Sequence, residues 1–160
     1  MSPQDQKYHL SLAGEFYVAA ELQRRGISAA VTYGNAKRAD VVAFSNADER
    51  VVKIEVKTTT SDDKWVIGNK IPEQSQTPWV FVRIPEGDGH PDFFVLTQAE
   101  MNQILTPIAG EYRRRYLARH GKDFEGPGVE TLRLQHVQSH RSAWRKIVDR
   151  LLAGKSEVLL

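Results

Sequence analysis

The stretch that decides the fold is Asp40-Val-Val-Ala-Phe-Ser-Asn-Ala-Asp-Glu-Arg-Val-Val-Lys-Ile-Glu-Val-Lys57. Its two apolar runs favour strands over residues 39–45 and 51–58, and the polar link between them predicts a β-hairpin. In the second run Val52, Ile54 and Val56 alternate with three charged residues, Lys53, Glu55 and Lys57. Because successive side chains of a strand point to opposite faces, one face of this strand is predicted to enter the core and the other to remain polar.

The length of the hairpin loop predicts which residues face each other. A loop over residues 46–49 pairs Ser45 with Arg50, and this register places Asp40 opposite Glu55, with Cβ atoms about 5 Å apart. Two facing carboxylates repel, so a partner of opposite charge is needed to offset the repulsion. Mg²⁺ is the simplest candidate because it prefers hard oxygen ligands, and Lys57 adds a cation on the same face. Carboxylates, a metal ion and an ammonium group together suit phosphodiester hydrolysis by a metal-activated water.

A helix is expected before the hairpin. Ser2, Pro3 and Asp5 form a helix start, and Gly26 supplies a stop. The 3.6-residue period predicts a core-facing side with Glu15 and Leu22 at its edge, so that Glu15 is half turned towards the core; the residues on that side are Leu12, Phe16, Ala19, Ala20 and Gln23.

The remaining elements follow from turn and capping signals. Strands are expected over 28–33, 79–84 and 93–96, and residues 59–78 are expected to form a loop in which Trp65–Ile67 is a candidate short strand. Thr97 and Glu100 form a capping box, Pro107 is expected to end or kink that helix, and further helices are expected over 108–120 and 141–152. The prediction is an α/β fold with an N-terminal helix, a mixed sheet of about five strands and a helical C-terminal part.

The composition limits the class of protein. The chain has 160 residues, 41% of them hydrophobic, which suits one folded domain over 1–160, with a core at about 5–97 and a helical extension at about 98–160. There is no cysteine, which excludes disulfides, thiol catalysis and thiolate zinc sites, and fits a reducing compartment. No run approaches the roughly 18 apolar residues that would span a bilayer. We therefore expect a cytoplasmic protein with no membrane segment.

The charge is unevenly distributed. Residues 1–110 carry 11 Lys and Arg against 14 Asp and Glu, whereas residues 111–160 carry 11 against 6. A basic C-terminal part predicts an anionic partner such as nucleic acid, and a solvated helix surface is the alternative. Candidate phosphate contacts are Lys37, Arg38, Lys64 and Lys70, and a candidate basic track consists of Arg113, Arg114, Arg115, Arg119, Arg141, Arg145 and Lys146. Trp144 is interpreted as core, and the His136–His140 pair, which lacks a third ligand, as chance.

Asp40, followed after fourteen residues by Glu55-Val56-Lys57, resembles the motif of the PD-(D/E)XK nuclease superfamily. Gly14-Glu15-Phe16 and the small and apolar residues after it resemble the first helix of its restriction-endonuclease-like and Holliday-junction-resolvase-like members. The resemblance covers residues 10–60. It implies a restriction-endonuclease-like core and a metal-dependent endonuclease that hydrolyses DNA.

Carried over by position, the resemblance implies that Asp40, Glu55 and the Val56 carbonyl bind Mg²⁺, which Mn²⁺ is expected to replace. Lys57 would orient or deprotonate the attacking water, and Glu15 would assist. A homodimer is compatible with cleavage of both strands of a duplex. The alternatives are a non-catalytic nucleic-acid-binding or regulatory domain that keeps the fold, and a homodimeric structural protein whose polar sheet face is incidental.

Overall fold

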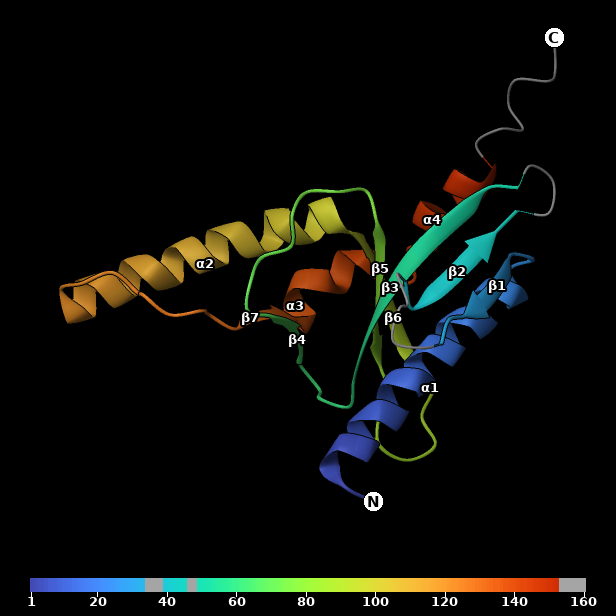
Figure 1. The fold of residues 1–160 in the computed structure, drawn as a ribbon, viewed down its shortest axis with the longest axis horizontal. Helices are drawn as coiled ribbons and strands as arrows, with labels where there is room; N and C mark the ends of the chain where they lie inside the picture. The colour runs from blue at the N-terminus through green and yellow to red at the C-terminus, as the bar shows by residue number, and fades with distance from the viewer. Residues whose placement is uncertain (34–38, 46–48, 153–160) are drawn as a thin grey trace, which may run out of the picture.

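The computed structural model describes residues 1–33, 39–45 and 49–152. Its elements, drawn in Figure 1, are α1 (Pro3–Arg24), β1 (Ser28–Val31), β2 (Val41–Phe44), β3 (Val51–Thr59), β4 (Lys64–Gly68), β5 (Pro78–Arg83), β6 (Asp92–Thr97), α2 (Gln98–His120), β7 (Glu130–Arg133), α3 (Leu134–Val137), the 3-10 turn η1 (Gln138–His140) and α4 (Arg145–Leu152). The predicted α/β fold, with an N-terminal helix, a mixed five-stranded sheet and helices towards the C-terminus, is confirmed.

Helix α1 begins at the predicted capping box, in which Ser2 Oγ accepts from the Asp5 N–H at 3.1 Å. Its buried face differs from the predicted one. Glu15, Val18 and Leu22 are buried, whereas Phe16 is 50% exposed and Gln23 is exposed. The prediction failed because Gly14 lies directly against Thr58 of β3, and this contact sets the rotation of the helix.

The main sheet has the order β1-β2-β3-β5-β6. The predicted hairpin register is confirmed from Val41, which pairs with Ile54, to Phe44, which pairs with Val51. The predicted alternation of β3 also holds, since Ile54 and Val56 are buried and Lys53 is exposed. Strand β3 is therefore central, with an antiparallel neighbour on one side and the parallel strand β5 on the other.

The connection from β3 to β5 is not only a loop, because the candidate short strand over Trp65–Ile67 is present. It contains β4, which pairs antiparallel with β7 to form a second, two-stranded sheet. Trp65 of β4 is 2% exposed, packs edge-on against Phe81 and Phe94, and donates from Nε1 to the Val82 carbonyl at 3.0 Å. The pairing was hidden because β7 lies more than sixty residues further along the chain.

Two apolar clusters hold these layers together. The first packs α1 and α4 against one face of the main sheet, with Leu22, Ile54, Val80 and Ile147 fully buried. The second covers the other face of β5 and β6 with residues of β4, β7, α2 and α3. Strand β3 contributes to the first cluster only, so its other face, which carries Glu55 and Lys57, lies beside the second layer.

The C-terminal part corrects three predictions. Helix α2 does not end at Pro107 but continues to His120, and Pro107 is exposed, so that water can replace the hydrogen bond that proline cannot donate. The extension from residue 98 is not wholly helical, because it contains β7. Instead of one helix over 141–152, α3, η1 and the shorter α4 are present. Among the described helices none is long and apolar enough to cross a membrane.

Replacing Gly14 with alanine is expected to destabilise the protein by about 1–3 kcal/mol, because the new Cβ would lie 1.9 Å from Thr58 Oγ1. Gly110→Ala in α2 is the matched control, since a Cβ there meets nothing within 4 Å. That variant should gain up to about 1 kcal/mol from helix propensity. Urea unfolding measures both. Equal effects would contradict the close contact between α1 and β3.

Stability is expected to fall as the pH drops below about 6.5, the usual histidine pKa. Burial and the Lys146 charge lower the pKa of His140, and burial and Arg133 lower the pKa of His136. The unfolded chain therefore binds protons at a higher pH than the folded chain does, and acidification favours unfolding. Urea midpoints measured between about pH 8 and pH 5 test this. His140→Gln should reduce the slope below about pH 6.5, and an unchanged slope would contradict this role of His140.

Candidate active site

Asp40 lies where the ladder between β2 and β3 ends. The Asp40 N–H donates to the Ile54 carbonyl at 3.1 Å, and the Asp40 carbonyl accepts from the Thr32 N–H at 3.0 Å. Since Ile54 is the registered partner of Val41, Asp40 sits one residue beyond the last registered pair. These two backbone hydrogen bonds hold Asp40 beside β3. It lies just beyond the paired residues of the register that predicted it opposite Glu55.

The Asp40 carboxylate is held by the backbone of β3. Its Oδ2 accepts a hydrogen bond from the Val56 N–H at 2.8 Å. The strand β2 begins only at Val41, so this side chain takes the place of a strand carbonyl beyond the end of the ladder. A hydrogen bond from a backbone N–H restricts the orientation of the carboxylate that accepts it. One carboxylate oxygen is thereby fixed to β3, one residue after Glu55.

Glu55 and Lys57 project from the polar face of β3. Both are partly exposed, and their registered neighbours on the parallel strand β5 are Trp79 and Phe81. Within the described part of the chain, the Lys57 ammonium makes no hydrogen bond and no ion pair. Val56 between them points its side chain into the core. The motif therefore presents a carboxylate and an available cation, while Val56 anchors the strand.

Glu15 approaches the same strand from α1. It is 3% exposed, and among the described residues it is the one charged residue that is buried. It follows Gly14, whose lack of a side chain allows α1 to lie against Thr58, one residue after Lys57. The sequence predicted that Glu15 is only half turned towards the core, whereas the close approach of α1 to β3 at Gly14 leaves it buried. Helix α1 thus brings a carboxylate to β3 from the face that carries Ile54 and Val56, opposite to the face of Glu55 and Lys57.

The oxygen donors suit a hard divalent cation with few protein ligands. The described residues contain no group of three or more His, Asp or Glu side chains placed to hold a metal ion. Asp40 and Glu55 supply two carboxylates on neighbouring chain segments, and Mg²⁺ is usually bound by one or two carboxylates, with water and phosphate oxygens completing its shell. The donor set therefore fits Mg²⁺ and does not fit a metal that needs a closed cage of protein side chains.

Of the four predicted basic contacts, the structure describes Lys64 and Lys70 only. Lys37 and Arg38 are outside the described residues. Lys64 begins β4, and Lys70 follows that strand; both are exposed on the second layer. Most cations of the predicted basic track are paired with acids: Arg114 and Arg115 with Glu111, Arg141 with Asp92, Arg145 with Asp149, and Lys146 with Glu100. That track is therefore largely neutralised locally.

Two further interpretations concern the C-terminal part. Trp144 is 3% exposed and packs against Phe93, as predicted for a core residue. His136 and His140 bind separate partners: His136 Nδ1 accepts from the Arg133 N–H at 3.1 Å, and His140 Nδ1 lies 2.8 Å from Lys146 Nζ. The interpretation of this pair as chance stays a prediction.

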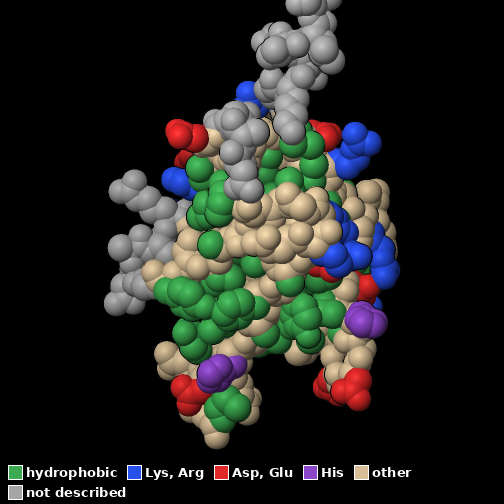
Figure 2. Space-filling model, turned by 90° about the vertical axis from the view of Figure 1, so that its right-hand side faces the viewer, with side chains coloured by type: hydrophobic (Ala, Val, Ile, Leu, Met, Phe, Trp, Pro, Cys, Tyr) green, Lys and Arg blue, Asp and Glu red, His purple; other side chains and the backbone are tan. Residues whose placement is uncertain are grey.

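Phe16 was predicted to face the core and Tyr33 was given no role, but the structure exposes both as a ring pair. Figure 2 shows the side of the molecule that carries α1, β1 and α4, where hydrophobic side chains gather on the surface. Phe16 and Tyr33 are 50% and 64% exposed, and their ring centroids lie 6.4 Å apart. Phe16 directly follows Glu15, and Tyr33 lies two residues after the end of β1, so an exposed ring pair lies close in sequence to Glu15 and to Thr32, whose N–H donates to the Asp40 carbonyl. Only the tertiary contact makes these two rings neighbours.

Comparison with known proteins supports the fold. No protein-family model matches the chain, and no curated protein matches it. Among solved structures the chain is similar to a bacterial homing endonuclease, I-Ssp6803I, with a TM-score of 0.55 and 12% sequence identity, over 98% of each chain. At this identity the likeness concerns the fold. The chain therefore has, over almost its whole length, a fold that is also found in a homing endonuclease.

Proposed function

We propose that this protein is a metal-dependent endonuclease that hydrolyses phosphodiester bonds of DNA. The observation that carries the proposal is a hydrogen bond on β3: the Val56 N–H donates to the Asp40 carboxylate at 2.8 Å. Val56 stands between Glu55 and Lys57 in the strand. A carboxylate that is fixed by the backbone, next to a lysine with no described ion partner, suits a reaction in which negative charge develops on a phosphate.

Asp40 and Glu55 would hold the metal ion, with the Val56 carbonyl as a further ligand and Mn²⁺ able to replace Mg²⁺. A bound Mg²⁺ lowers the pKa of a coordinated water and neutralises charge on the phosphate. Asp40 keeps one oxygen on the Val56 N–H, and this contact restricts the position of its other oxygen.

Lys57 would act from the same face of β3 as Glu55. Its ammonium group can donate hydrogen bonds to the attacking water or to the phosphate oxygens, which stabilises the charge that forms in the transition state. Glu15, buried on α1 next to the contact with Thr58, would assist as a second acid or base at the end of the strand. The PD-(D/E)XK assignment rests on these four residues.

Two properties support DNA as the substrate. The fold is shared with an endonuclease, and the part of the chain from residue 111 has an excess of five positive charges (11 against 6). A homodimer would supply two active sites for the two strands of a duplex. The cysteine-free composition supports a cytoplasmic location.

Substitution of the motif should abolish cleavage while the fold survives. Asp40→Asn, Glu55→Gln and Lys57→Met are each expected to lower the rate of Mg²⁺-dependent plasmid nicking by a factor on the order of 10²–10⁴, because each removes a charge from the reacting centre. Lys53→Met is the matched control, since Lys53 is an exposed lysine of the same strand. If Lys57→Met kept the activity of Lys53→Met, the role of Lys57 would be wrong.

Metal binding separates the enzyme from the alternative of a non-catalytic binding domain. Titration calorimetry with Mn²⁺ is expected to detect binding to the wild type and not to Asp40→Asn, whose amide oxygen can still accept from the Val56 N–H. The same samples are then assayed for plasmid nicking. If the wild type bound no metal even with DNA present, the carboxylates would be structural and the binding-domain alternative would stand.

A further inference from the structure

A cavity of about 840 Å³ lies apart from the motif on β3. The second half of α2 extends away from the sheet, and the buried residues of this helix, Met101 and Leu105, are both in its first half (Figure 1). The chain after α2 returns along it, with Phe124 packing against Tyr112 and Tyr116 at centroid distances of 5.5 and 5.2 Å. The cavity lies between α2, this returning segment, β7 and residues 69–71, within the size range of ligand pockets.

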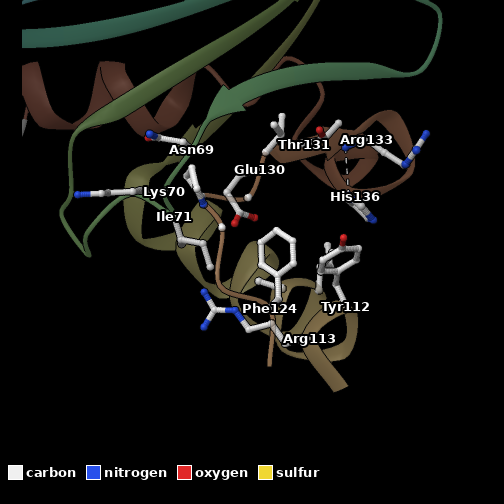
Figure 3. A pocket seen from close by; sticks show the side chains of 16 residues that line it. Asn69, Lys70, Ile71, Tyr112, Arg113, Phe124, Glu130, Thr131, Arg133 and His136 are labelled. Atoms are coloured by element: carbon white, nitrogen blue, oxygen red, sulfur yellow. Dashed lines mark hydrogen bonds between the residues drawn. The ribbon is translucent and has the colours of Figure 1, made fainter. Parts of the chain in front are cut away.

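The interior of the cavity combines aromatic walls with one acceptor. Figure 3 shows Tyr112, Phe124 and Ile71 around Glu130, whose carboxylate points to the middle of the lining side chains. Within the described part of the chain, this carboxylate has no hydrogen bond and no ion pair. His136 completes the wall, and burial together with Arg133 lowers its pKa, so it is neutral at pH 7. The interior thus offers flat apolar surface and a single negative acceptor.

The rim of the cavity is positive. Arg113 and Lys70 reach out on the side of Ile71, away from His136 (Figure 3). Neither makes an ion pair with a described residue, in contrast to Arg114, which binds Glu111 at 2.6 Å. The third cation, Arg133, is already paired with Asp63. Two cations at the rim and one carboxylate inside define a charge pattern that a ligand must match.

Only some ligands satisfy this pattern. A phosphate inside the cavity would be repelled by Glu130, and an acyl chain would leave that carboxylate unsolvated without a donor. A basic peptide could reach Glu130 but would meet the cations at the rim. A nucleotide fits both parts, because its base is planar and carries N–H donors, while its phosphate is anionic.

We propose that the cavity binds one unstacked nucleotide of the DNA strand, with the base against the ring pair of Tyr112 and Phe124 and the phosphate at Lys70 and Arg113. Guanine is the preferred base, since its adjacent N1–H and N2–H groups can donate together to the Glu130 carboxylate. This assignment rests on the proposed function in so far as the ligand is DNA. It adds a site that recognises a base outside the catalytic motif.

The test is fluorescence anisotropy with the full chain in EDTA, so that no cleavage occurs. The probes are labelled single-stranded oligothymidylate and the same strand with one central guanine. The wild type is expected to bind the guanine strand about tenfold more tightly. Glu130→Gln should bind both strands equally, because the neutral amide loses the charge-assisted contact. Equal binding of both strands by the wild type, or an unchanged preference in Glu130→Gln, would overturn the proposal.

The phosphate contact is tested with two substitutions in α2. Arg113→Ala is expected to weaken binding of both strands by about tenfold, whereas Arg114→Ala, which removes a cation already paired with Glu111, should have a much smaller effect. Equal effects would overturn the role of Arg113. Circular dichroism checks that each variant is folded.

Further measurements test two other occupants of the cavity, a free nucleotide and a second copy of the chain. Free guanosine monophosphate should compete only weakly; competition as strong as that of the strand would assign the cavity to a free nucleotide instead. The wild type and Glu130→Gln should have the same sedimentation coefficient. Self-association that depends on Glu130 would assign the cavity to a second copy of the chain.

The same variants separate this proposal from the proposed function. Guanine-dependent binding without metal-dependent nicking would leave the cavity assignment intact and remove the nuclease activity. Metal-dependent nicking without guanine-dependent binding would support the nuclease activity and overturn the cavity assignment.

Discussion

The hydrogen bond from the Val56 N–H to the Asp40 carboxylate is the contact on which the candidate site depends. Strand β3 is central in the sheet, and its neighbour β2 begins only at Val41, so beyond that point the backbone of β3 needs another acceptor. A buried N–H without a partner costs about 1–3 kcal/mol, and Asp40 supplies the missing oxygen. The requirement that stabilises the end of the ladder therefore also fixes a carboxylate beside Glu55 and Lys57.

The arrangement of the layers explains why this face of β3 is polar. Helices α1 and α4 cover one face of the whole sheet, whereas the second layer packs on β5 and β6 only. Trp65 attaches that layer through Phe81, Phe94 and the Val82 carbonyl. Glu55 and Lys57 lie at its border, partly exposed, where a charged strand face keeps contact with water and remains reachable by a polymer.

The local features of the fold could be predicted because they depend on neighbouring residues. The capping boxes at Ser2 and Thr97, the alternation of β3 and the register between β2 and β3 follow from short-range spacing, and all are present. The buried face of α1 could not be predicted, because the charge of Glu15 argues against burial and the contact between Gly14 and Thr58 joins distant segments. The β4–β7 sheet joins segments that are far apart, and the continuous α2 depends on Pro107 facing water.

By itself the sequence determined the α/β class, the central hairpin and the residues of the catalytic hypothesis, since these rest on period, turn length and residue type along one stretch of chain. The tertiary structure alone decided that Asp40 bonds to the β3 backbone, that α1 buries Glu15, and that α2 and β7 enclose a cavity around Glu130. The physical reason is that each of these features requires contacts between distant segments, and their geometry is set by how whole layers pack and not by the residues next to them in the chain.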